Sequence, residues 1–422
     1  MNERILLCLA HMSGKEMEYI KEAFDSNWVV PLGPNVNGFE VDLEEFVNIC
    51  ENGKELDKKV VALSSGTSAI HLALVACRVE PGDEVIVQSF TFCASSHPVT
   101  YLGALPVFVD SEPETWNMDP ELLESAIQDR IEKTGKKPKA IIPVALYGMP
   151  YQIDKIMEIA NKYDIPVIED AAEGFGSRYD GQVLGTFGKF GILSFNGNKM
   201  ITTSGGGAII CPDEESKKEI MFYATQARES YPYYQHEKIG YNYRMSNICA
   251  GIGRGQMTIL EDHIKHHQHV QELYCELLKD VTGLTMHINP SSKYNSNFWL
   301  CTAVLDPDLK IKGQEKAYSK LITGAIGGAT GVIHAATTTH TESEPNPNVE
   351  ALRLALDKAN IEARPLWKPM HLQPVYKNNP SYVNGISENL FKKGICLPSG
   401  PYVTETHVRY IVDIIKNTIV EK

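Results

Sequence analysis

Short apolar runs alternate with helical patterns from about residue 60 to residue 210 of this 422-residue chain. Residues 153–164 are apolar at helical spacing, through Ile153, Ile156, Met157 and Ala160. The apolar runs are rich in β-branched residues, are bounded by Gly, Pro or Asp, and occupy residues 59–65, 83–89, 105–110, 139–145 and 165–170. Buried strands separated by helices predict an α/β fold, with a mostly parallel central sheet and helices on both faces.

Two more strands, at 192–195 and 206–210, are predicted on either side of Lys199, joined by a tight turn. A long helix over about 246–280 is expected to lead out of this part of the chain. The remainder has a strand candidate at 298–305 and helical patterns near 349–360 and 405–418, which indicates a smaller C-terminal α/β domain.

We therefore expect a large domain with an N-terminal arm over residues 1–255 and a small domain over 256–422. The segment at about 308–347 is biased towards Gly, Ala and Thr and has weak periodicity. This composition indicates an insertion or a mobile loop. Its role stays open.

The bulk composition excludes several classes of partner. A net charge of -13 argues against a nucleic-acid or anionic-membrane surface, which would need clustered Lys and Arg. The run at 5–10 is too short for a signal peptide, and no apolar run approaches the roughly 20 residues of a membrane span. The nine cysteines form no CxxC pair, so free thiols and a soluble, cytoplasmic protein are expected.

Histidines cluster in the stretch 261–271, where His263 and His267 stand four residues apart. This spacing would suit a metal ion on one face of a helix. No acidic or cysteine partner follows at metal-ligand spacing. The stretch is therefore interpreted as a solvated linking helix, and no metal is expected.

Lys199 lies in a polar segment between two apolar runs, and a phosphate clamp, a surface charge and a nucleophile are the alternatives. A phosphate-binding P-loop needs G-x-x-x-x-G-K-[ST], but Lys199 follows Asn198 and precedes Met200. The phosphate clamp is excluded on this pattern. The residues that accompany Lys199 decide between the other two.

Polar residues follow several of the predicted strands, at the edge where ligands of parallel sheets collect. Asp170 ends one strand. The alternative interpretation of this residue is an ordinary helix cap or turn former. Gly66, Thr67 and Ser68 lie between a strand and the helix that follows it. Exposed N–H groups and the helix dipole there suit a phosphate, and an ordinary helix N-cap is the alternative.

Two further strand ends add to this set. Phe92 would present a flat ring to a ligand, unless it packs in the core, and Ser194 offers a hydroxyl just before Lys199. An amine, a carboxylate, an aromatic plate and a phosphate cradle are together what pyridoxal 5'-phosphate requires. The lysine bonds to this cofactor, and the carboxylate keeps its pyridine nitrogen protonated. The combination favours the nucleophilic role for Lys199.

The sequence resembles the DegT/DnrJ/EryC1/StrS sugar aminotransferases, which have the type I PLP-dependent aminotransferase fold. The resemblance runs through nearly the whole chain and rests on motifs that occur in the family order. These motifs are "NWVVPLGPNVNGFE", "SSGTSAIHLAL", "QSFTFCASSHPV", "IEDAAEGFGS", "SFNGNKMITTSGGG", "GYNYRMSNICAGIG" and "RPLWKPMHLQPVY". The stretch "TTSGGG" departs from the family, because many members have an acidic residue there.

The resemblance implies a role for each candidate residue. Lys199 is expected to form the Schiff base and to shuttle protons, and Asp170 to bind the pyridine nitrogen. Phe92 is expected to stack on the ring, and Glu173 to lie near the cofactor hydroxyl. The residues expected at the cofactor phosphate are Gly66, Thr67, Ser68 and Ser194. Asn242 matches an asparagine that reaches the neighbouring subunit's site, which implies a homodimer with shared active sites.

The resemblance also implies the reaction and its substrates. L-Glutamate is the expected amino donor, and a nucleotide-linked keto sugar the acceptor, for surface polysaccharide or glycan synthesis. The motifs are closest to enzymes that aminate the 4-keto carbon of UDP-2-acetamido-2,6-dideoxy sugars. The alternatives are a GDP-perosamine synthase type, a 3-keto sugar aminotransferase, and a non-catalytic regulator that binds the cofactor. Dehydratases of the same fold have histidine at the lysine position, and Lys199 argues against them.

Candidates for the sugar and nucleotide pocket lie in the first and last of these motifs. They are Trp28 and Pro31 near the N-terminus and Lys368 and His371 near the C-terminus. Ordinary loop packing is the alternative for each of them.

Overall fold

The computed structural model describes residues 3–318 and 343–420. The helices of the described chain are α1 Glu16–Asp25, α2 Pro34–Val47, α3 Gly66–Ala76, α4 His97–Tyr101, α5 Pro120–Thr134, α6 Ile153–Tyr163, α7 Glu214–Ala224, α8 Asn247–Met257, α9 Leu260–Leu278, α10 Pro347–Lys358, α11 Ile386–Lys393 and α12 Glu405–Thr418. The strands of the main sheet are β1 Lys59–Leu63, β2 Glu84–Gln88, β3 Leu105–Val109, β4 Ala140–Ile142, β5 Ile168–Asp170, β8 Phe190–Ser194, β9 Gly207–Cys211 and β14 Ser381–Tyr382. The remaining strands are β6 Arg178–Tyr179, β7 Gln182–Val183, β10 Leu284–Met286, β11 Tyr294–Asn295, β12 Cys301–Leu305, β13 Arg364–Pro365 and β15 Gly394–Leu397.

The main sheet consists of two four-stranded sections, in the orders β1-β9-β8-β5 and β14-β3-β2-β4. Two parallel bridges, Ile141 to Val167 and Val144 to Asp170, lie in or next to β4 and β5 and join the two sections. β9 is antiparallel to both of its neighbours, and the remaining pairs are parallel. The predicted mostly parallel sheet is confirmed.

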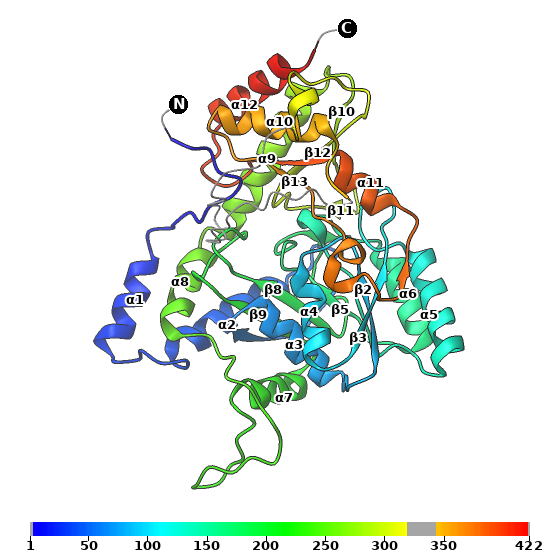
Figure 1. The fold of residues 1–422 in the computed structure, drawn as a ribbon. Helices are drawn as coiled ribbons and strands as arrows, with labels where there is room; N and C mark the ends of the chain where they lie inside the picture. Colours follow the sequence, from blue (N-terminus) through cyan, green and yellow to red (C-terminus); the bar gives the residue numbers. More distant parts are fainter. Residues whose placement is uncertain (1–2, 319–342, 421–422) are drawn as a thin grey trace.

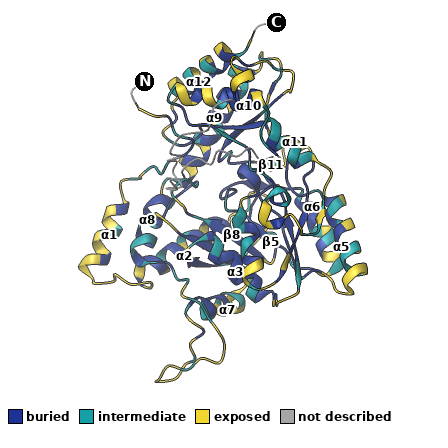
Figure 2. Cartoon of the chain, viewed as in Figure 1, coloured by how far each residue is buried: buried dark blue, intermediate teal, exposed yellow. Residues whose placement is uncertain are grey.

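Alternate residues of each strand pack against different layers of helices. Val60 and Ile86 belong to a core cluster that includes side chains of α2, α5 and α6. Val61 and Val85, one position away, belong to a second cluster with side chains of α3, α7 and the segment around α4. This alternation follows from the period of two in a strand. Both faces of the sheet are therefore covered, and the exposed residues lie on the outer surfaces of helices such as α1 and α5 (Figure 2).

The C-terminal part of the chain forms an antiparallel sheet in the order β10-β12-β15-β13. A third core cluster packs this sheet against α9, α10 and α12 and includes Ile5 from the N-terminal segment. In Figure 1 this part lies above the main sheet, with both termini beside it. β14 comes from the C-terminal part of the chain but pairs with β3 of the main sheet. The boundary between residues 255 and 256 stays a prediction.

Two predicted connections differ from the structure. Residues 195–206 separate β8 from β9, so a long irregular segment carries Lys199 in place of the expected tight turn. The expected helix over 246–280 is two helices, α8 and α9. The break is at Thr258, whose hydroxyl donates a hydrogen bond to the carbonyl of Gly255 at 2.7 Å, and at Ile259, whose φ of -123° is not helical.

The interpretation of residues 261–271 as a solvated helix is wrong for the face that carries His263 and His267, whereas Glu261, Asp262, Lys265 and His269 are exposed. His263 is 4% exposed and His267 is 0% exposed. α9 lies between the C-terminal sheet and the main-sheet core, because its apolar residues pack with both clusters. This packing also buries His263 and His267. Among the described residues, no group of three or more His, Cys, Asp or Glu could hold a metal ion.

The predicted insertion at 308–347 lies largely outside the described residues. Of its described ends, Ile311 and Ala317 belong to the third core cluster, and the Tyr318 hydroxyl donates to the carbonyl of Pro345 at 2.7 Å. Within residues 3–318 and 343–420, none of the helices combines the length and the apolar character that a membrane span needs.

The start of β9 lies against the start of α3, which gives a first prediction. A Cβ added at Gly207 would collide with the backbone of Ser65 and Gly66. We expect Gly207→Ala to lower the free energy of unfolding by about 1–3 kcal/mol, because the backbones must separate. Gly205→Ala is the matched control, since nothing lies within 4 Å of its added Cβ. Equal denaturation midpoints for the two variants would contradict this close approach.

Candidate active site

Asp170 is the last residue of β5 and lies at the carboxyl edge of the main sheet. It is 5% exposed, and its Oδ2 accepts a hydrogen bond of 2.6 Å from the Ser95 hydroxyl. That hydroxyl lies 2.7 Å from the hydroxyl of Thr91, and the backbone N–H of Ala172 donates to Oδ1. Burial raises the pKa of Asp170, while the Ser95 hydrogen bond and the charge of Lys199 act in the opposite direction. The carboxylate is therefore fixed and mostly removed from water.

Lys199 lies in the segment between β8 and β9. Its Nζ is 3.5 Å from Glu173 Oε1 and 4.1 Å from the centre of the Trp299 ring. The Trp299 indole N–H donates to the carbonyl of Asn198 at 2.6 Å, so the ring is tied to the residue that precedes the lysine. The lysine side chain is 13% exposed. The alternative interpretation of Lys199 as a surface charge does not fit this burial.

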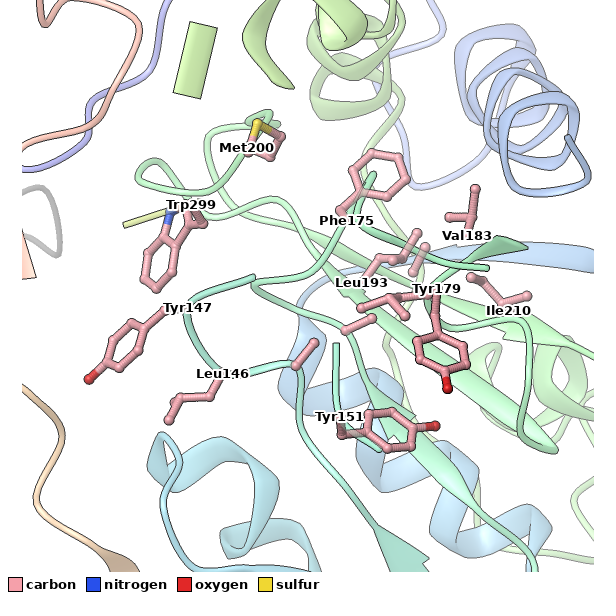
Figure 3. Close-up of a cluster of buried hydrophobic side chains, with 14 of the residues drawn as sticks. Leu146, Tyr147, Tyr151, Phe175, Tyr179, Val183, Leu193, Met200, Ile210 and Trp299 are labelled. Carbon is pink, nitrogen blue, oxygen red and sulfur yellow. The ribbon is translucent and has the colours of Figure 1, made fainter. Parts of the chain in front are cut away.

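Glu173 lies on the loop that follows Asp170 and is 5% exposed. Its Oε2 accepts a hydrogen bond of 2.7 Å from the backbone N–H of Tyr147, which has a φ of 54° in the left-handed region. Burial raises the pKa of Glu173, and the charge of Lys199 opposes this. Figure 3 shows Trp299 between Met200, which follows Lys199, and Tyr147, whose backbone binds Glu173.

The N-terminus of α3 lies beside the end of β8. A Cβ added at Gly66 would be 3.2 Å from Ser194 Cβ. Ser65 caps the helix by accepting from the backbone N–H of Ser68, whose hydroxyl donates to the Ser65 carbonyl at 2.7 Å. The N–H groups of Gly66 and Thr67 have no acceptor inside the helix, because they belong to its first turn. These groups and the half-buried hydroxyls of Thr67 and Ser194 can bind an anion, whereas the Ser68 hydroxyl is used by the cap.

Phe92 and the segment after β13 form an aromatic wall. Phe92 is 48% exposed, and its ring centre lies 5.4 Å from that of Trp367. The backbone N–H of Trp367 donates to the Tyr147 hydroxyl at 2.8 Å, and the rings of Trp367 and Tyr147 are nearly parallel. The exposed face of Phe92 is thus open to a ligand at the carboxyl end of β2.

Lys368 and His371 lie on the same segment. His371 Nδ1 is 2.6 Å from the Ser89 hydroxyl, next to the end of β2. Burial lowers the pKa of His371, and Asp110 acts in the opposite direction. Lys368 Nζ donates to the carbonyl of Ser343 at 3.2 Å. The structure therefore brings these two candidates to the side of the site that carries Phe92.

The other candidates lie apart from Lys199. Trp28 and Pro31 are exposed between α1 and α2, where the Asn247 side chain donates to the Trp28 carbonyl at 3.0 Å. Asn242 is exposed and follows the segment that projects beyond α7 in Figure 1. Among the described residues, no hydrogen bond, ion pair or ring contact joins these three to Lys199.

The sequence did not identify several residues of the site. Ser95 stands inside the motif that contains Phe92, and its position just past a strand was the signal available. Trp367 stands directly before Lys368 in the last family motif, whereas Tyr147 carried no signal beyond its aromatic ring. The sequence predicts Trp299 within a strand, but it precedes β12, and its contact with Lys199 spans about a hundred residues of sequence.

The charged and hydrogen-bonding groups of the site can be compared with the groups that pyridoxal phosphate needs. Lys199 pairs with Glu173, which leaves Asp170 as the buried carboxylate available to a second cation, such as a protonated pyridine nitrogen. The start of α3, with Thr67 and Ser194, suits a phosphate. The residues therefore fit pyridoxal phosphate. A main sheet that places an amine, a buried carboxylate and an anion site at one edge fits the class of pyridoxal phosphate-dependent aminotransferases.

Comparison with known proteins identifies the family. The chain matches the DegT/DnrJ/EryC1/StrS aminotransferase family over residues 11–327 and 320–416, and it belongs to this family. It is 42% identical to EpsN of Bacillus subtilis, named as a pyridoxal phosphate-dependent aminotransferase, over 98% of this chain and 96% of EpsN. It is 33% identical to the GDP-perosamine synthase of Escherichia coli O157:H7, with 97% of each chain covered.

The same fold is found in solved structures. A DegT DnrJ EryC1 StrS aminotransferase from Brucella abortus aligns with a TM-score of 0.79 and 27% identity, over 96% of this chain and 95% of that chain. The expected family, fold and cofactor are confirmed, and the chain is a pyridoxal phosphate-dependent aminotransferase.

The hydrogen bond from Ser95 to Asp170 gives a second prediction. Ser95→Ala leaves a buried carboxylate oxygen without its donor, and we expect the free energy of unfolding to fall by about 1–3 kcal/mol. Because this hydrogen bond favours the ionised form of Asp170, the variant should also release pyridoxal phosphate more readily on dialysis. Ser125→Ala, at an exposed serine of α5 bonded to the Glu121 carbonyl, is the control. Cofactor retention equal to that of the control would show that Ser95 does not support Asp170.

Proposed function

We propose that this enzyme transfers the amino group of L-glutamate to the keto carbon of a nucleotide-linked sugar. The sugar is proposed to be a 4-keto-6-deoxy sugar, of the UDP-2-acetamido-2,6-dideoxy type. The observation that carries the proposal is the convergence of Lys199, Asp170 and Glu173 at one sheet edge, in a chain related over 97% of its length to a named GDP-perosamine synthase. The 4-amino product would serve surface polysaccharide or glycan synthesis.

Each residue of the site has a proposed task. Lys199 Nζ holds the cofactor and carries the proton that moves during amino transfer, with Glu173 as its neighbour at 3.5 Å. Bound pyridoxal phosphate supplies a ring that withdraws electrons from the carbon losing its proton. Asp170 holds a positive charge on the ring nitrogen, and Ser95 keeps its carboxylate in place. The α3 N-terminus, Thr67 and Ser194 bind the phosphate, and Phe92 stacks on the ring.

The acceptor sugar is proposed to bind on the side of Phe92 and the segment of Lys368 and His371. Lys368 lies half-buried there and can reach a phosphate of the nucleotide through its ammonium group. The choice of a UDP sugar rests on the resemblance of the motifs "NWVVPLGP" and "RPLWKPMHLQP". The relative named as a GDP-perosamine synthase supports GDP-linked 4-keto sugars as the second candidate.

A third prediction tests the reaction itself. The purified holoenzyme is incubated with L-glutamate and a panel of UDP-, GDP- and TDP-linked 4-keto and 3-keto sugars, and the products are identified by mass and NMR. We expect amination at C4 of a UDP-linked N-acetylated sugar and no turnover by Lys199→Ala. Asp170→Asn should lose orders of magnitude in rate while it stays folded, because the charge on the carboxylate is needed. Amination at C3, or activity that survives Lys199→Ala, would refute the proposal.

We also propose that the enzyme is a homodimer with shared active sites. Exposed apolar side chains gather on α1 and the residues that follow, where Met17 is 68% and Phe24 61% exposed. Trp28, Val29, Val30 and Leu32 are also exposed and lie next to Pro31, so apolar residues follow one another along this surface, as they do at protein–protein interfaces. Its proposed occupant is a second copy of the chain. Asn242 would then reach the phosphate cradle of that copy.

Subunit mixing gives the fourth prediction. Asn242→Ala should weaken cofactor retention, and Lys199→Ala should be inactive. In a heterodimer of the two variants, one site carries both lesions and the other carries neither. We therefore expect activity at limiting pyridoxal phosphate to rise above that of either unmixed variant. Absence of recovery, with subunit exchange demonstrated by native mass spectrometry, would refute the shared site.

A further inference from the structure

α9 presents two buried histidines towards the segments that hold Lys199. His263 and His267 stand four residues apart, so they share one face of the helix. Neither belongs to the cofactor site, and their burial is not explained by a metal ion, since the described chain contains no suitable cluster. Each of them instead contacts a backbone carbonyl adjacent to a residue of the site.

His267 holds the segment that carries Trp299. Its Nδ1 lies 3.1 Å from the carbonyl oxygen of Phe298 and must donate, because a carbonyl only accepts. Phe298 has a φ of 47°, a left-handed conformation that a residue with a bulky side chain adopts only when its surroundings impose it. The imidazole N–H is therefore one of the contacts that keep this strained residue in place.

The conformation of Phe298 sets the position of Trp299. Trp299 follows directly, and its backbone N–H donates to the Asn297 side chain at 2.8 Å. Its ring lies 4.1 Å from Lys199 Nζ, and its indole N–H binds the carbonyl of Asn198. A rotation at Phe298 would move the ring that contacts the lysine ammonium.

His263 holds the other side of the lysine. Its Nδ1 lies 3.0 Å from the carbonyl oxygen of Met200, the residue after Lys199, and donates for the same reason. Its Nε2 is then the acceptor for His11 Nδ1 at 3.2 Å. One helix thus binds the backbone on the C-terminal side of Lys199 and, through Phe298 and Trp299, the backbone on its N-terminal side.

We propose that His263 and His267 are positioning residues that fix Lys199 from two sides, His267 through Phe298 and Trp299, and His263 through Met200. This inference rests on the proposed role of Lys199 in the reaction. It assigns to the histidines no contact with substrate or cofactor.

Burial keeps the imidazole rings of His263 and His267 in the neutral form, in which one nitrogen donates to the carbonyl. Burial lowers the pKa of His263, and it lowers the pKa of His267 to about 3. At neutral pH each ring is therefore uncharged, with one N–H for its carbonyl and no second positive charge near the lysine ammonium.

The fifth prediction compares substitutions that keep or remove the donor of His267. Asn places an amide N–H near the position of imidazole Nδ1, whereas Gln places it near Nε2, and Leu removes it. His287→Leu is the matched control, because His287 is also buried and its Nε2 lies 3.1 Å from a carbonyl, that of Glu114. Two measurements are made: reductive methylation of Lys199 in the cofactor-free protein, followed by peptide mass spectrometry, and kcat and KM of the holoenzyme.

We expect His267→Leu and His267→Gln to be methylated at Lys199 several-fold faster than wild type, and His267→Asn and His287→Leu at the wild-type rate. In the holoenzyme, kcat of His267→Leu should fall on the order of a hundredfold with little change in KM, since the amine is misplaced. If the leucine variant does not fold, the Asn and Gln pair carries the comparison.

Equal labelling of His267→Asn and His267→Gln, or faster labelling of His287→Leu to the same extent, would overturn the proposal. The labelling is done without cofactor or sugar, so its rate does not depend on which reaction the enzyme catalyses. An enzyme that aminates none of the offered sugars would thus refute the proposed function without changing this result.

Discussion

The site depends on how a lysine ammonium is held where little water reaches it. Glu173 supplies a negative charge at 3.5 Å and Trp299 a ring face at 4.1 Å. A buried charge without partners costs several kcal/mol, so the lysine needs both. Glu173 in turn needs Lys199 and the backbone N–H of Tyr147, because burial raises the pKa of its carboxyl group. Neither charge could stay in this position if the loop of the other moved away.

The main sheet brings these loops together. β5 and β8 are parallel neighbours, so Asp170 and Ser194 end at the same edge. β9 returns antiparallel beside β8 and begins at Gly207, against the first turn of α3. Only a residue without a side chain allows this contact, and the contact sets the anion site next to Ser194. The geometry of the candidate cofactor site thus follows from strand order and one close backbone approach.

Segments from the end of the chain complete the site. The stretch that follows β13 docks on β2 through His371 and Ser89 and carries Trp367 to Phe92. β14 then joins the main sheet beside β3. α9 connects the two parts of the molecule and reaches the lysine loop and the tryptophan loop with its histidines. The C-terminal part of the chain is therefore needed for the site as much as the main sheet.

The sequence alone predicted the features that depend on neighbours along the chain. β-Branched runs with helices between them identified the sheet, and residues at strand ends identified Asp170, Ser194 and the start of α3. Lys199 was predicted as the cofactor lysine because these residues, taken together, are the groups that pyridoxal phosphate needs. Strand periodicity and strand ends are local properties, so they can be read without coordinates.

Contacts between distant segments could not be read in this way. Trp299 meets the carbonyl of Asn198 across 101 positions of sequence, and the Trp367 backbone meets Tyr147 across 220. His263 and His267 are buried although the sequence predicts a solvated helix there, because burial depends on what packs around the helix, and a helical repeat does not contain that information. The sequence determined which groups of the cofactor site end at the sheet edge. The tertiary structure decided which partners hold Lys199 there, because those partners come from segments that only packing brings together.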